Sequence, residues 1–520
     1  VYAYTMLRSV PELLRHFQEL YPYICVDEAQ DTSKIQHAII ALLASGSENL
    51  FMVGDEDQSI YGFRAAYPEA LLTFEKNYPD AKVLLMEENF RSDARIVLAA
   101  DRFIQKNTLR HEKHMKAARK PASDIREISL RSRKAQYTYL AKLAEGCTSQ
   151  TAILYRDNEC ILPLVDLLER NGIPYQMRNA ELSFFSHRTI LDIINIIKLA
   201  QNPMDTEAFL QIYYKIGTYL RKQDAIRIAR ISEEKRIPVL DVAAEDPDLN
   251  GHVLGSVRSM RTHLQNLLQD SGERALYRIM QYMGYQEYLN RSGLSDSKLE
   301  ILRILGSRAD SPMELAERLE QLKVLIREKE PDRKCPLILS TIHASKGLEY
   351  DSVYLIDVAD GILPESIPQN LHQASAEELK AYEEERRLFY VGVTRAKDHL
   401  TLFTTNRPST FCSEFLGKSS VTEEGRKNLM PVESRISRTF KQARPYAAVA
   451  GIRQTKASEE LYFRLKEELG TGVIVEHKKY GEGVVTQLDD RLVHIMFQDD
   501  TLRMMDLKIL ANAGLLKVKK

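Results

Sequence analysis

Tryptophan is absent from the 520 residues, and cysteine is rare. The five cysteines are odd in number, and none stands in the CxxC spacing of zinc sites and redox motifs. This scarcity argues against a disulfide framework or a zinc centre. It favours a reducing, cytoplasmic location.

Long apolar runs are also missing. A membrane-spanning helix needs roughly 18 consecutive apolar residues, whereas the most apolar helix-like stretch, 189–200, is broken by Asp192, Asn195 and Lys198. The first residues show neither a charged n-region nor a cleavage site, so no secretory signal is predicted there. We therefore expect no association with a membrane.

Neither charge sign is in excess, because 72 Lys and Arg against 73 Asp and Glu give a formal net charge of -1. This balance excludes a uniformly basic nucleic-acid coat but leaves room for a local basic groove. The basic run 102–134 fits such a groove along a DNA path, and it fits a solvated charged face equally well.

Length and composition predict several folded domains, three or four at roughly 150 residues each. In the first third, the apolar runs 23–26, 50–53 and 83–86 alternate with helix-period segments such as 35–44 and 70–77. Buried strands that alternate with helices predict an α/β fold, with a parallel sheet covered on both faces.

The pattern changes further along the chain. Residues 202–336 are predicted to be helical, with a strand at 151–155 before them and strands at 337–340, 353–356 and 399–403 after them. We interpret this all-helical block as an insertion into a second α/β domain. The expected parts of the chain are 1–87 for the first α/β domain, 88–201 with 337–420 for the second, 202–336 for the insertion, 421–468 for a linker and 469–520 for a small β-barrel.

Paired acids, Asp27 and Glu28, follow the first predicted strand. The carboxyl end of a parallel strand is where α/β sheets bind ligands. A nucleoside triphosphatase needs one carboxylate to hold Mg²⁺ and another to activate water. Acids that merely complement a helix dipole would give the same pattern, so these two residues leave both interpretations open.

A second polar segment, Gly54–Ala66, follows the next strand. Gln58 is of the type that senses a γ-phosphoryl group. Beyond it, Tyr61, Phe63 and Arg64 alternate aromatic and cationic character, as on surfaces that stack single-stranded bases. A polar turn followed by core aromatics is the alternative.

Three further segments are Glu88–Ser92, Thr341–Asp351 and Glu383–Ala396, the last of them a predicted helix. An arginine of that helix, such as Arg395, would neutralise charge on the γ-phosphate if it reached a neighbouring domain's nucleotide. Otherwise Arg386, Arg387 and Arg395 are solvated surface charges.

Together and in this order, DEAQD, GDEDQSIYGFRAA, ENFRS, TIHASKGLEYD and EEERRLFYVGVTRA resemble motifs II to VI of the UvrD/Rep/PcrA-type superfamily 1 DNA helicases. The resemblance spans roughly residues 1–415, and the last segment resembles the small Tudor-like barrel that ends many members. It implies two RecA-like domains of the P-loop NTPase type, with a helical insertion in the second. It also implies ATP-driven 3'→5' movement along one DNA strand that displaces the other, in repair or replication.

The same resemblance implies roles for single residues. Asp27 would hold Mg²⁺ and Glu28 would activate water. The residues implied to contact ATP are Gln58, Arg91 and Arg395 at the γ-phosphate, Phe90 at the adenine and Glu349 at the ribose. Those implied to contact single-stranded DNA are Tyr61, Phe63, Arg64, Arg156 and Asn158, with His343 between DNA and nucleotide. Duplex DNA, and RNA polymerase or a repair protein at the C-terminal barrel, are the other implied partners.

The largest departure from the family is an absence. No GxxxxGK[ST] phosphate loop occurs, and the one Gly-Lys-Ser, at 417–419, follows no strand and has Cys412 where the first glycine belongs. The chain begins about 26 residues before Asp27. We therefore expect a fragment without the N-terminal Walker A portion, which is inactive or nearly so in isolation. The alternative function is a non-hydrolysing module that binds DNA or a protein.

Overall fold

The computed structural model describes residues 1–418 except 178–182, 294–296, 330–331, 333, 372 and 408, together with parts of 465–518. Those parts are 473–478, 480–488, 492–497, 502–506 and 516–518, with the single positions 465, 469 and 510. The chain divides into two compact units, 1–420 and 421–520. The expected linker, 421–468, lies outside the described residues apart from Leu465.

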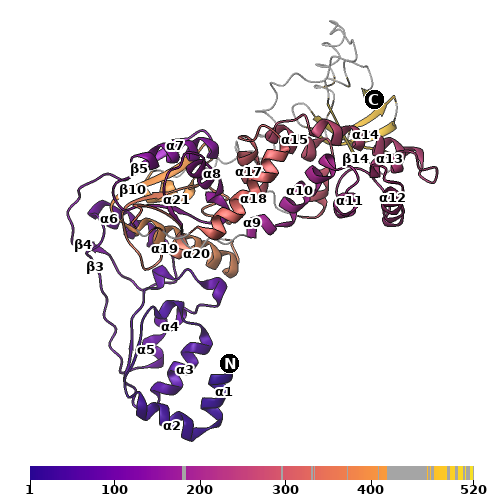
Figure 1. The fold of residues 1–520 in the computed structure, drawn as a ribbon. Coiled ribbons are helices and arrows are strands. Elements are labelled where there is room, and N and C mark those ends of the chain that lie inside the picture. The colour runs from indigo at the N-terminus through magenta and orange to yellow at the C-terminus, as the bar shows by residue number, and fades with distance from the viewer. Residues whose placement is uncertain are drawn as a thin grey trace. The chain divides into compact units, whose positions relative to one another are not determined.

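A six-stranded parallel sheet forms the centre of the first unit, in the order β5-β10-β9-β6-β8-β7 (Figure 1). Its strands are β5 (Arg126–Leu130), β6 (Thr151–Tyr155), β7 (Gln176–Met177), β8 (Leu337–Thr341), β9 (Tyr350–Leu355) and β10 (Ala396–Thr405). Strands from before and after the helical block interleave in this sheet. The strands predicted at 151–155, 337–340, 353–356 and 399–403 are all present, although β9 begins three residues earlier.

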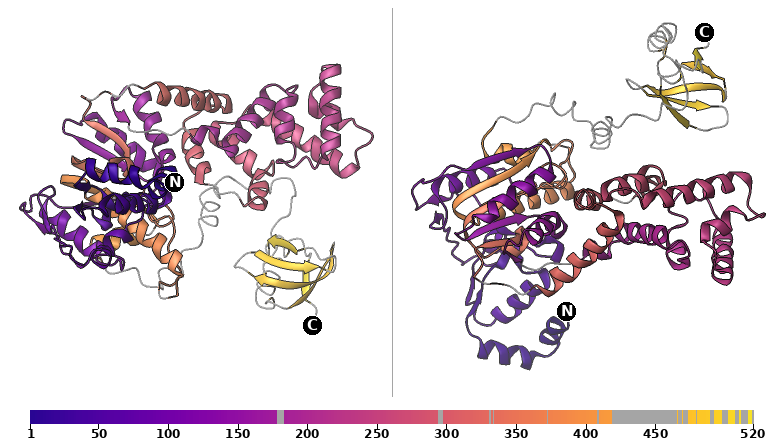
Figure 2. Two further views of the ribbon diagram at one scale, coloured as in Figure 1. Left: turned by 90° about the horizontal axis from the view of Figure 1, so that it is seen from below. Right: turned by 45° about the horizontal axis from the view of Figure 1, so that its top comes forward.

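Both faces of the sheet are covered, because successive side chains of a strand point to opposite faces. On β6, Ile153 and Tyr155 belong to one core cluster, while Ala152 and Leu154 belong to another. Helices lie on each face (Figure 2). The first cluster includes residues of α7 (Arg133–Glu145) and α8 (Leu162–Arg170), and the second includes residues of α6 (Ala94–Ile104), α20 (Ala376–Val393) and α21 (Thr410–Phe415).

Between β7 and β8, the described residues form helices and no strand, in agreement with the helical block predicted at 202–336. These helices are α9 (Ser183–Ser186), α10 (Arg188–Gln201), α11 (Thr206–Ile212), α12 (Lys222–Lys235), α13 (Val239–Ala244), α14 (Gly251–Leu267), α15 (Gly272–Gln281), α16 (Tyr285–Arg291), α17 (Ser297–Gly306) and α18 (Pro312–Glu328). Their apolar faces continue the first core cluster. Over the part of the chain that is described, no helix combines the length and the apolar character needed to cross a bilayer.

The N-terminal segment carries a short parallel pair, β1 (Ile24–Val26) and β2 (Leu50–Met52), in which Ile24 pairs with Leu50. The helices before and between these strands are α1 (Tyr2–Ser9), α2 (Pro11–Leu20) and α3 (Lys34–Ala44). Ser33 and Gln36 form a capping box at the start of α3. The strands predicted at 23–26 and 50–53 and the helix predicted at 35–44 are thus confirmed.

Two predictions for this segment are wrong. Residues 83–86 form no strand, and Leu84 and Met86 are 84% and 85% exposed. Pairing begins instead at β3 (Glu88–Asn89), which lies parallel to β4 (Lys116–Ala117). The helix predicted at 70–77 is split into α4 (Glu69–Leu72) and α5 (Phe74–Asn77) at Thr73, whose hydroxyl donates to the Glu69 carbonyl at 2.8 Å. Such local side-chain bonds compete with a continuous helix.

The second unit contains a five-stranded antiparallel sheet in the order β14-β13-β12-β11-β15. Its strands are β11 (Ile474–His477), β12 (Gly481–Leu488), β13 (Leu492–Phe497), β14 (Leu502–Asp506) and β15 (Leu516–Val518). Val475, Val485 and Ile495 are among its buried core residues. The β-rich character predicted for 469–520 is therefore present, and closure into a barrel stays a prediction.

We expect Phe103→Ala to lower the free energy of unfolding of the first unit by about 3–5 kcal/mol, because it leaves a cavity in the core. Phe103 is fully buried, with ring centroids 4.9 Å from Phe389, 5.3 Å from Phe411 and 6.0 Å from Phe415. Urea unfolding followed by circular dichroism measures the change. The control Leu98→Ala, 63% exposed on the same helix, should change it by no more than about 0.5 kcal/mol. Equal losses in the two variants would contradict this core.

Candidate active site

The paired acids Asp27 and Glu28 stand in the turn after β1, where both are exposed. The Glu28 N–H donates to Asp27 Oδ1 at 2.8 Å. Glu28 has a left-handed backbone with φ of 49°, which costs of order 1–3 kcal/mol for a non-glycine residue. The Ala29 N–H donates to the Val53 carbonyl at 3.0 Å, so the turn is fixed to the end of β2. The structure thus presents two neighbouring carboxylates on a strained, anchored turn.

Gln30, to which the sequence analysis gave no role, connects this turn to the next one. Its side chain is buried, with Nε2 donating to Glu28 Oε2 at 2.5 Å and Oε1 accepting from the Asp55 N–H at 3.0 Å. Gly54 makes room for it, because a Cβ there would lie 2.6 Å from Gln30 Oε1. The sequence feature that could have identified Gln30 is its position as a neutral amide among the acids of DEAQD.

Gln58 and Arg395 meet from opposite ends of the sequence. Arg395 Nη2 donates to Gln58 Oε1 at 3.3 Å. Gln58 ends a short 3-10 turn, η2 (Glu56–Gln58), after β2, and Arg395 stands between α20 and β10. The helix predicted over 383–396 therefore ends early, at Val393. The reason is that Arg395 leads directly into β10, which runs in the sheet.

Arg395 is 1% exposed, and its hydrogen bonds go to neutral oxygens. Nε donates to the Val391 carbonyl at 3.0 Å and Nη1 to the Leu348 carbonyl at 3.2 Å. Burial, followed by the positive charge of Arg91, lowers the pKa of Arg395 to about 10. Among the described residues, no carboxylate forms an ion pair with it. A buried cation that forms no ion pair is costly, so this guanidinium is suited to an anionic ligand.

Lys346 is a second buried cation at the same place, and the sequence analysis gave it no role although it lies in TIHASKGLEYD. Its Nζ is 2.6 Å from Asp31 Oδ2 and 3.5 Å from Glu28 Oε2, and it donates to the Gln58 carbonyl at 2.8 Å. The side chain is 6% exposed. Lys346 therefore joins the two acid-bearing turns to the segment that follows β8.

Arg91, Phe90 and Glu349 form the neighbouring group. Arg91 Nε is 2.9 Å from Glu349 Oε2, and Lys397 Nζ is 3.1 Å from Glu349 Oε1. Hydrogen bonds from these two cations lower the pKa of Glu349. Phe90 is 71% exposed, so its ring is accessible for stacking. The structure thus brings together the residues predicted for ATP.

The residues predicted for single-stranded DNA gather next to this group. Ring centroids of Tyr61, Phe63 and His343 lie 5.6–6.1 Å apart. The Tyr61 hydroxyl donates to the His343 carbonyl at 3.1 Å, and the Arg64 guanidinium lies 5.1 Å from the Tyr61 ring centroid. Phe63 is 68% exposed. The exposed Phe63 is therefore not a core residue, whereas Tyr61 is partly buried and packs against the second core cluster, as the alternative prediction of core aromatics held.

Arg156 and Asn158 differ from the other predicted DNA residues. Arg156 Nη2 lies 2.5 Å from Glu385 Oε1 and 2.7 Å from Glu365 Oε2, and Nη1 lies 3.0 Å from Asp157 Oδ1. Burial opposes its charge, but these carboxylates raise the pKa of Arg156 overall. Asn158 begins the turn η4 (Asn158–Ile161), and its Oδ1 is buried without a hydrogen-bond partner among the described residues. The charge of Arg156 is therefore already neutralised within the protein.

We expect the free energy of unfolding to decrease as the pH falls from about 6.5 to about 4, in part because of His343. Burial, followed by the positive charge of Arg156, lowers the pKa of His343 from 6.5 to about 4. Between these values the unfolded chain binds more protons, so acid favours unfolding. In His343→Gln, the loss of stability between pH 7 and pH 5 should be smaller than in wild type by about 2 kcal/mol. Urea unfolding at both pH values measures it. The control His399→Gln, which replaces an exposed histidine, should lose as much stability between pH 7 and pH 5 as wild type. If His343→Gln also lost as much as wild type, His343 would not be a source of the pH dependence.

Relatives of this chain include helicases from several bacteria. YjcD of Bacillus subtilis is 31% identical over 417 residues, which cover 77% of this chain and 54% of YjcD. Two proteins named ATP-dependent DNA helicase PcrA, from Staphylococcus epidermidis and Staphylococcus aureus, are 28% and 26% identical, and each match covers 94% of this chain and 69% of the relative. The chain thus spans about half the length of YjcD and about two thirds of the PcrA proteins.

Family models match most of the first unit. The UvrD/REP helicase N-terminal domain matches residues 1–79, and the UvrD-like helicase C-terminal domain matches residues 84–407. Because the N-terminal model covers the start of the chain, the expectation of a missing N-terminal portion gains no support. The C-terminal model covers more than half of the 520 residues, and on this match the chain belongs to the UvrD-like helicase family.

Proposed function

We propose that this chain acts as an ATP-dependent DNA helicase of the UvrD type, which moves 3'→5' along one strand and displaces the other in repair or replication. One observation carries the proposal. The buried Arg395 guanidinium contacts Gln58 and has neutral hydrogen-bond partners only, over the residues that are described. A triphosphate is an anion that would form the ion pair that Arg395 lacks among the described residues.

In the proposed reaction, Glu28 orients the attacking water and accepts its proton. Gln58 and Arg395 contact the γ-phosphate, and the positive charge of Arg395 stabilises the charge that develops there. Arg91 adds a second cation, while Glu349 binds near the ribose and Phe90 stacks on the adenine. Lys346 supports this arrangement because it holds the Gln58 carbonyl close to Glu28.

Asp27 is the residue proposed to hold Mg²⁺. In proteins Mg²⁺ usually takes one or two carboxylates, with water and phosphate oxygens as its other ligands. The exposed Asp27 carboxylate fits that role, and no group of three or more His, Cys, Asp or Glu within the described ranges could hold a metal by itself. The ion would neutralise phosphate charge during hydrolysis.

For DNA, we propose that Tyr61 and Phe63 stack on bases while Arg64 contacts a phosphate. His343, whose ring centroid lies 5.6 Å from that of Phe63, is proposed to connect this surface to the nucleotide residues. Arg156 and Asn158 complete the proposed set, and Arg156 would exchange a carboxylate for a phosphate when DNA binds. Duplex DNA is the proposed substrate of unwinding.

The 520 residues contain no GxxxxGK[ST], and such loops cradle phosphates with consecutive N–H groups and a lysine. Lys418 of the Gly-Lys-Ser pairs instead with Glu127. We therefore propose that these residues alone hydrolyse little or no ATP. The same observation favours a second candidate function, a non-hydrolysing module that binds DNA or protein.

The second unit is proposed to close into a Tudor-like barrel and to bind RNA polymerase or a repair protein. A cytoplasmic location completes the proposal. It is supported by the five cysteines, all of which are free thiols.

We expect Phe63→Ala to weaken the binding of single-stranded DNA by about 1–3 kcal/mol, the contribution of one stacked base. Fluorescence anisotropy with a labelled thymidine oligonucleotide measures the affinity. The matched control is Phe51→Ala on β2, which removes a ring that is 62% exposed away from the proposed DNA residues, and it should bind as wild type does. Unchanged binding by Phe63→Ala would remove Phe63 from the interface.

We expect no DNA-stimulated phosphate release from ATP by the 520-residue chain above the rate without DNA. Measuring phosphate release with and without the oligonucleotide tests this. Stimulated turnover would contradict the proposed inactivity, and Glu28→Gln would then decide the role of the acid. Loss of that turnover in Glu28→Gln supports Glu28 as the residue that activates water, whereas turnover at the wild-type rate rejects it.

A further inference from the structure

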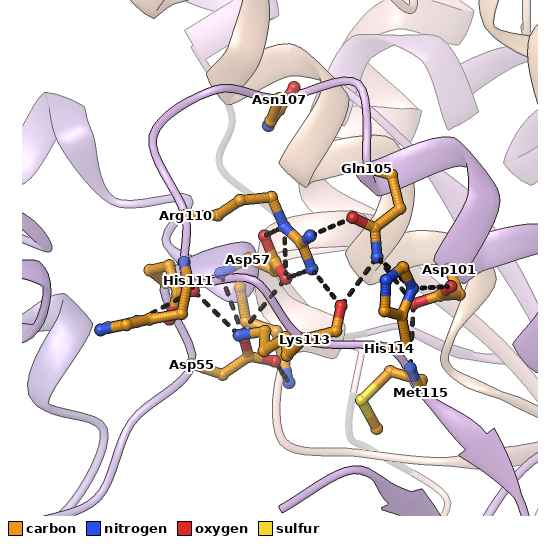
Figure 3. Close-up of polar contacts among 12 residues, drawn as sticks. Asp55, Asp57, Asp101, Gln105, Asn107, Arg110, His111, Lys113, His114 and Met115 are labelled. Carbon is orange, nitrogen blue, oxygen red and sulfur yellow. Dashed lines mark hydrogen bonds and ion pairs between the residues drawn. The ribbon is translucent and has the colours of Figure 1, made fainter. Parts of the chain in front are cut away.

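A basic loop, residues 105–116, runs from the end of α6 to the first residue of β4 and crosses to the acidic turn after β2 (Figure 3). Lys113 Nζ lies 2.6 Å from Asp55 Oδ1, 3.1 Å from Glu56 Oε1 and 3.3 Å from Asp57 Oδ2. Arg110 Nη2 lies 2.9 Å from Asp57 Oδ2, and Arg110 Nε also donates to that carboxylate. One ammonium therefore contacts three consecutive carboxylates.

The other side of the basic loop is fixed to the helices that pack on the large sheet. The Thr108 N–H and hydroxyl both donate to Glu383 Oε1 at 2.7 Å, and Asn107 Nδ2 donates to the Glu383 carbonyl at 3.0 Å. The Met115 N–H donates to Asp101 Oδ1 at 2.9 Å. The loop thus connects α6 and α20 to the turn that carries Gln58.

The contacts lie out of solvent. The side chains of Arg110, Glu56 and Asp57 are 6%, 4% and 3% exposed, and that of Lys113 is 12% exposed. Burial opposes charge on Lys113, yet the three acids raise its pKa above the ordinary value. Lys113 in turn lowers the pKa of Asp55, against the effect of burial. Removing one partner of a buried ion pair leaves an uncompensated charge, so the loss of Lys113 would weaken the hold on Asp55 and Glu56, while the Arg110–Asp57 pair and the bond from the His111 N–H to Glu56 remain.

A continuous path leads from Lys113 to the proposed γ-phosphate site. Asp55 binds Lys113 through Oδ1, while its Oδ2 accepts from Gln58 Nε2 at 2.7 Å. Gln58 Oε1 then accepts from Arg395 Nη2 at 3.3 Å. Because the amide nitrogen is committed to Asp55, the amide oxygen faces Arg395. Rotation of Asp55 would leave the Gln58 amide free to turn over.

We propose that Lys113 is a positioning residue for Gln58: it fixes the Asp55 carboxylate, which orients the Gln58 amide toward Arg395, while Arg110 neutralises Asp57. The importance of that orientation rests on the function proposed for Gln58. The orientation itself is a property of the protein without nucleotide or DNA, so it can be tested separately.

The test is NMR of the full 520-residue chain, perdeuterated and selectively labelled with ¹⁵N-glutamine, without nucleotide or DNA. The side-chain NH₂ signals of Gln58 are assigned by their loss in Gln58→Ala. In wild type and in Lys113→Arg, which keeps the charge, we expect two resolved signals displaced from those of exposed glutamines. In Lys113→Met, which keeps most of the stem, they should move to the positions of exposed glutamines, and the backbone amide hydrogen exchange of Gln58 should become at least about tenfold faster.

Two further variants separate positioning from general destabilisation. Lys116→Met removes a lysine from the same loop whose partner is Glu87, with the lysine side chain 69% exposed, and should match wild type. In the double variant Asp55→Asn with Lys113→Met, amide hydrogen exchange should be no faster than in the faster of the two single variants, because both substitutions remove the same contact. The proposal would be overturned if Lys113→Met showed the Gln58 signals of wild type, or if Lys113→Arg did not show them. It would also be overturned if the exchange rates of the two single variants added in the double variant. Absence of DNA binding would count against the proposed function alone.

Discussion

The buried guanidinium of Arg395 is the constraint on which the rest of the site depends. Its hydrogen bonds reach carbonyl, amide and hydroxyl oxygens, and none of them reaches a carboxylate over the residues described. A protein tolerates such a charge only where the surrounding fold fixes it. Here α20 supplies the Val391 carbonyl and the turn before β9 supplies the Leu348 carbonyl. The sheet order explains this, because β9 and β10 are direct neighbours in it.

The acids, by contrast, are held by neutral and cationic side chains that belong to other segments. Gln30 joins Glu28 to Asp55, and Lys346 reaches Glu28 from the segment after β8. Arg387 Nε also donates to the Ser59 carbonyl at 3.0 Å. The turns after β1 and β2 are therefore fixed to the helices and turns around the large sheet by buried polar contacts. Moving one set of groups would change the position of the other, as the proposed coupling between nucleotide and DNA would require.

Sequence reasoning succeeded where a signal is local. Short apolar runs flanked by polar turns located β1, β2, β6, β8 and β10, and the motif order placed Gln58 and Arg395 in one site. It failed at 83–86, because an apolar run does not reveal whether a neighbouring strand is present to pair with it. Partners far apart in the sequence are equally invisible, which is why Gln30 and Lys346 were missed. The ion pairs of Arg156 also depend on Glu365 and Glu385, more than 200 residues away.

The basic run 102–134 shows the same limit, because neither a DNA path nor a solvated face describes its central part. Arg110 and Lys113 are buried against Asp57 and Asp55. Further along, Arg119 pairs with Asp398 and donates to the Arg91 carbonyl. A cation that already pairs with a buried carboxylate is not available to bind a phosphate, and the pairing offsets the cost of removing that cation from water. The positive charges of Arg110, Lys113 and Arg119 therefore act within the protein, where they hold the Gln58 turn and the Arg91 segment against the large sheet. Other cations of the run, among them Lys120 and Arg126, are exposed.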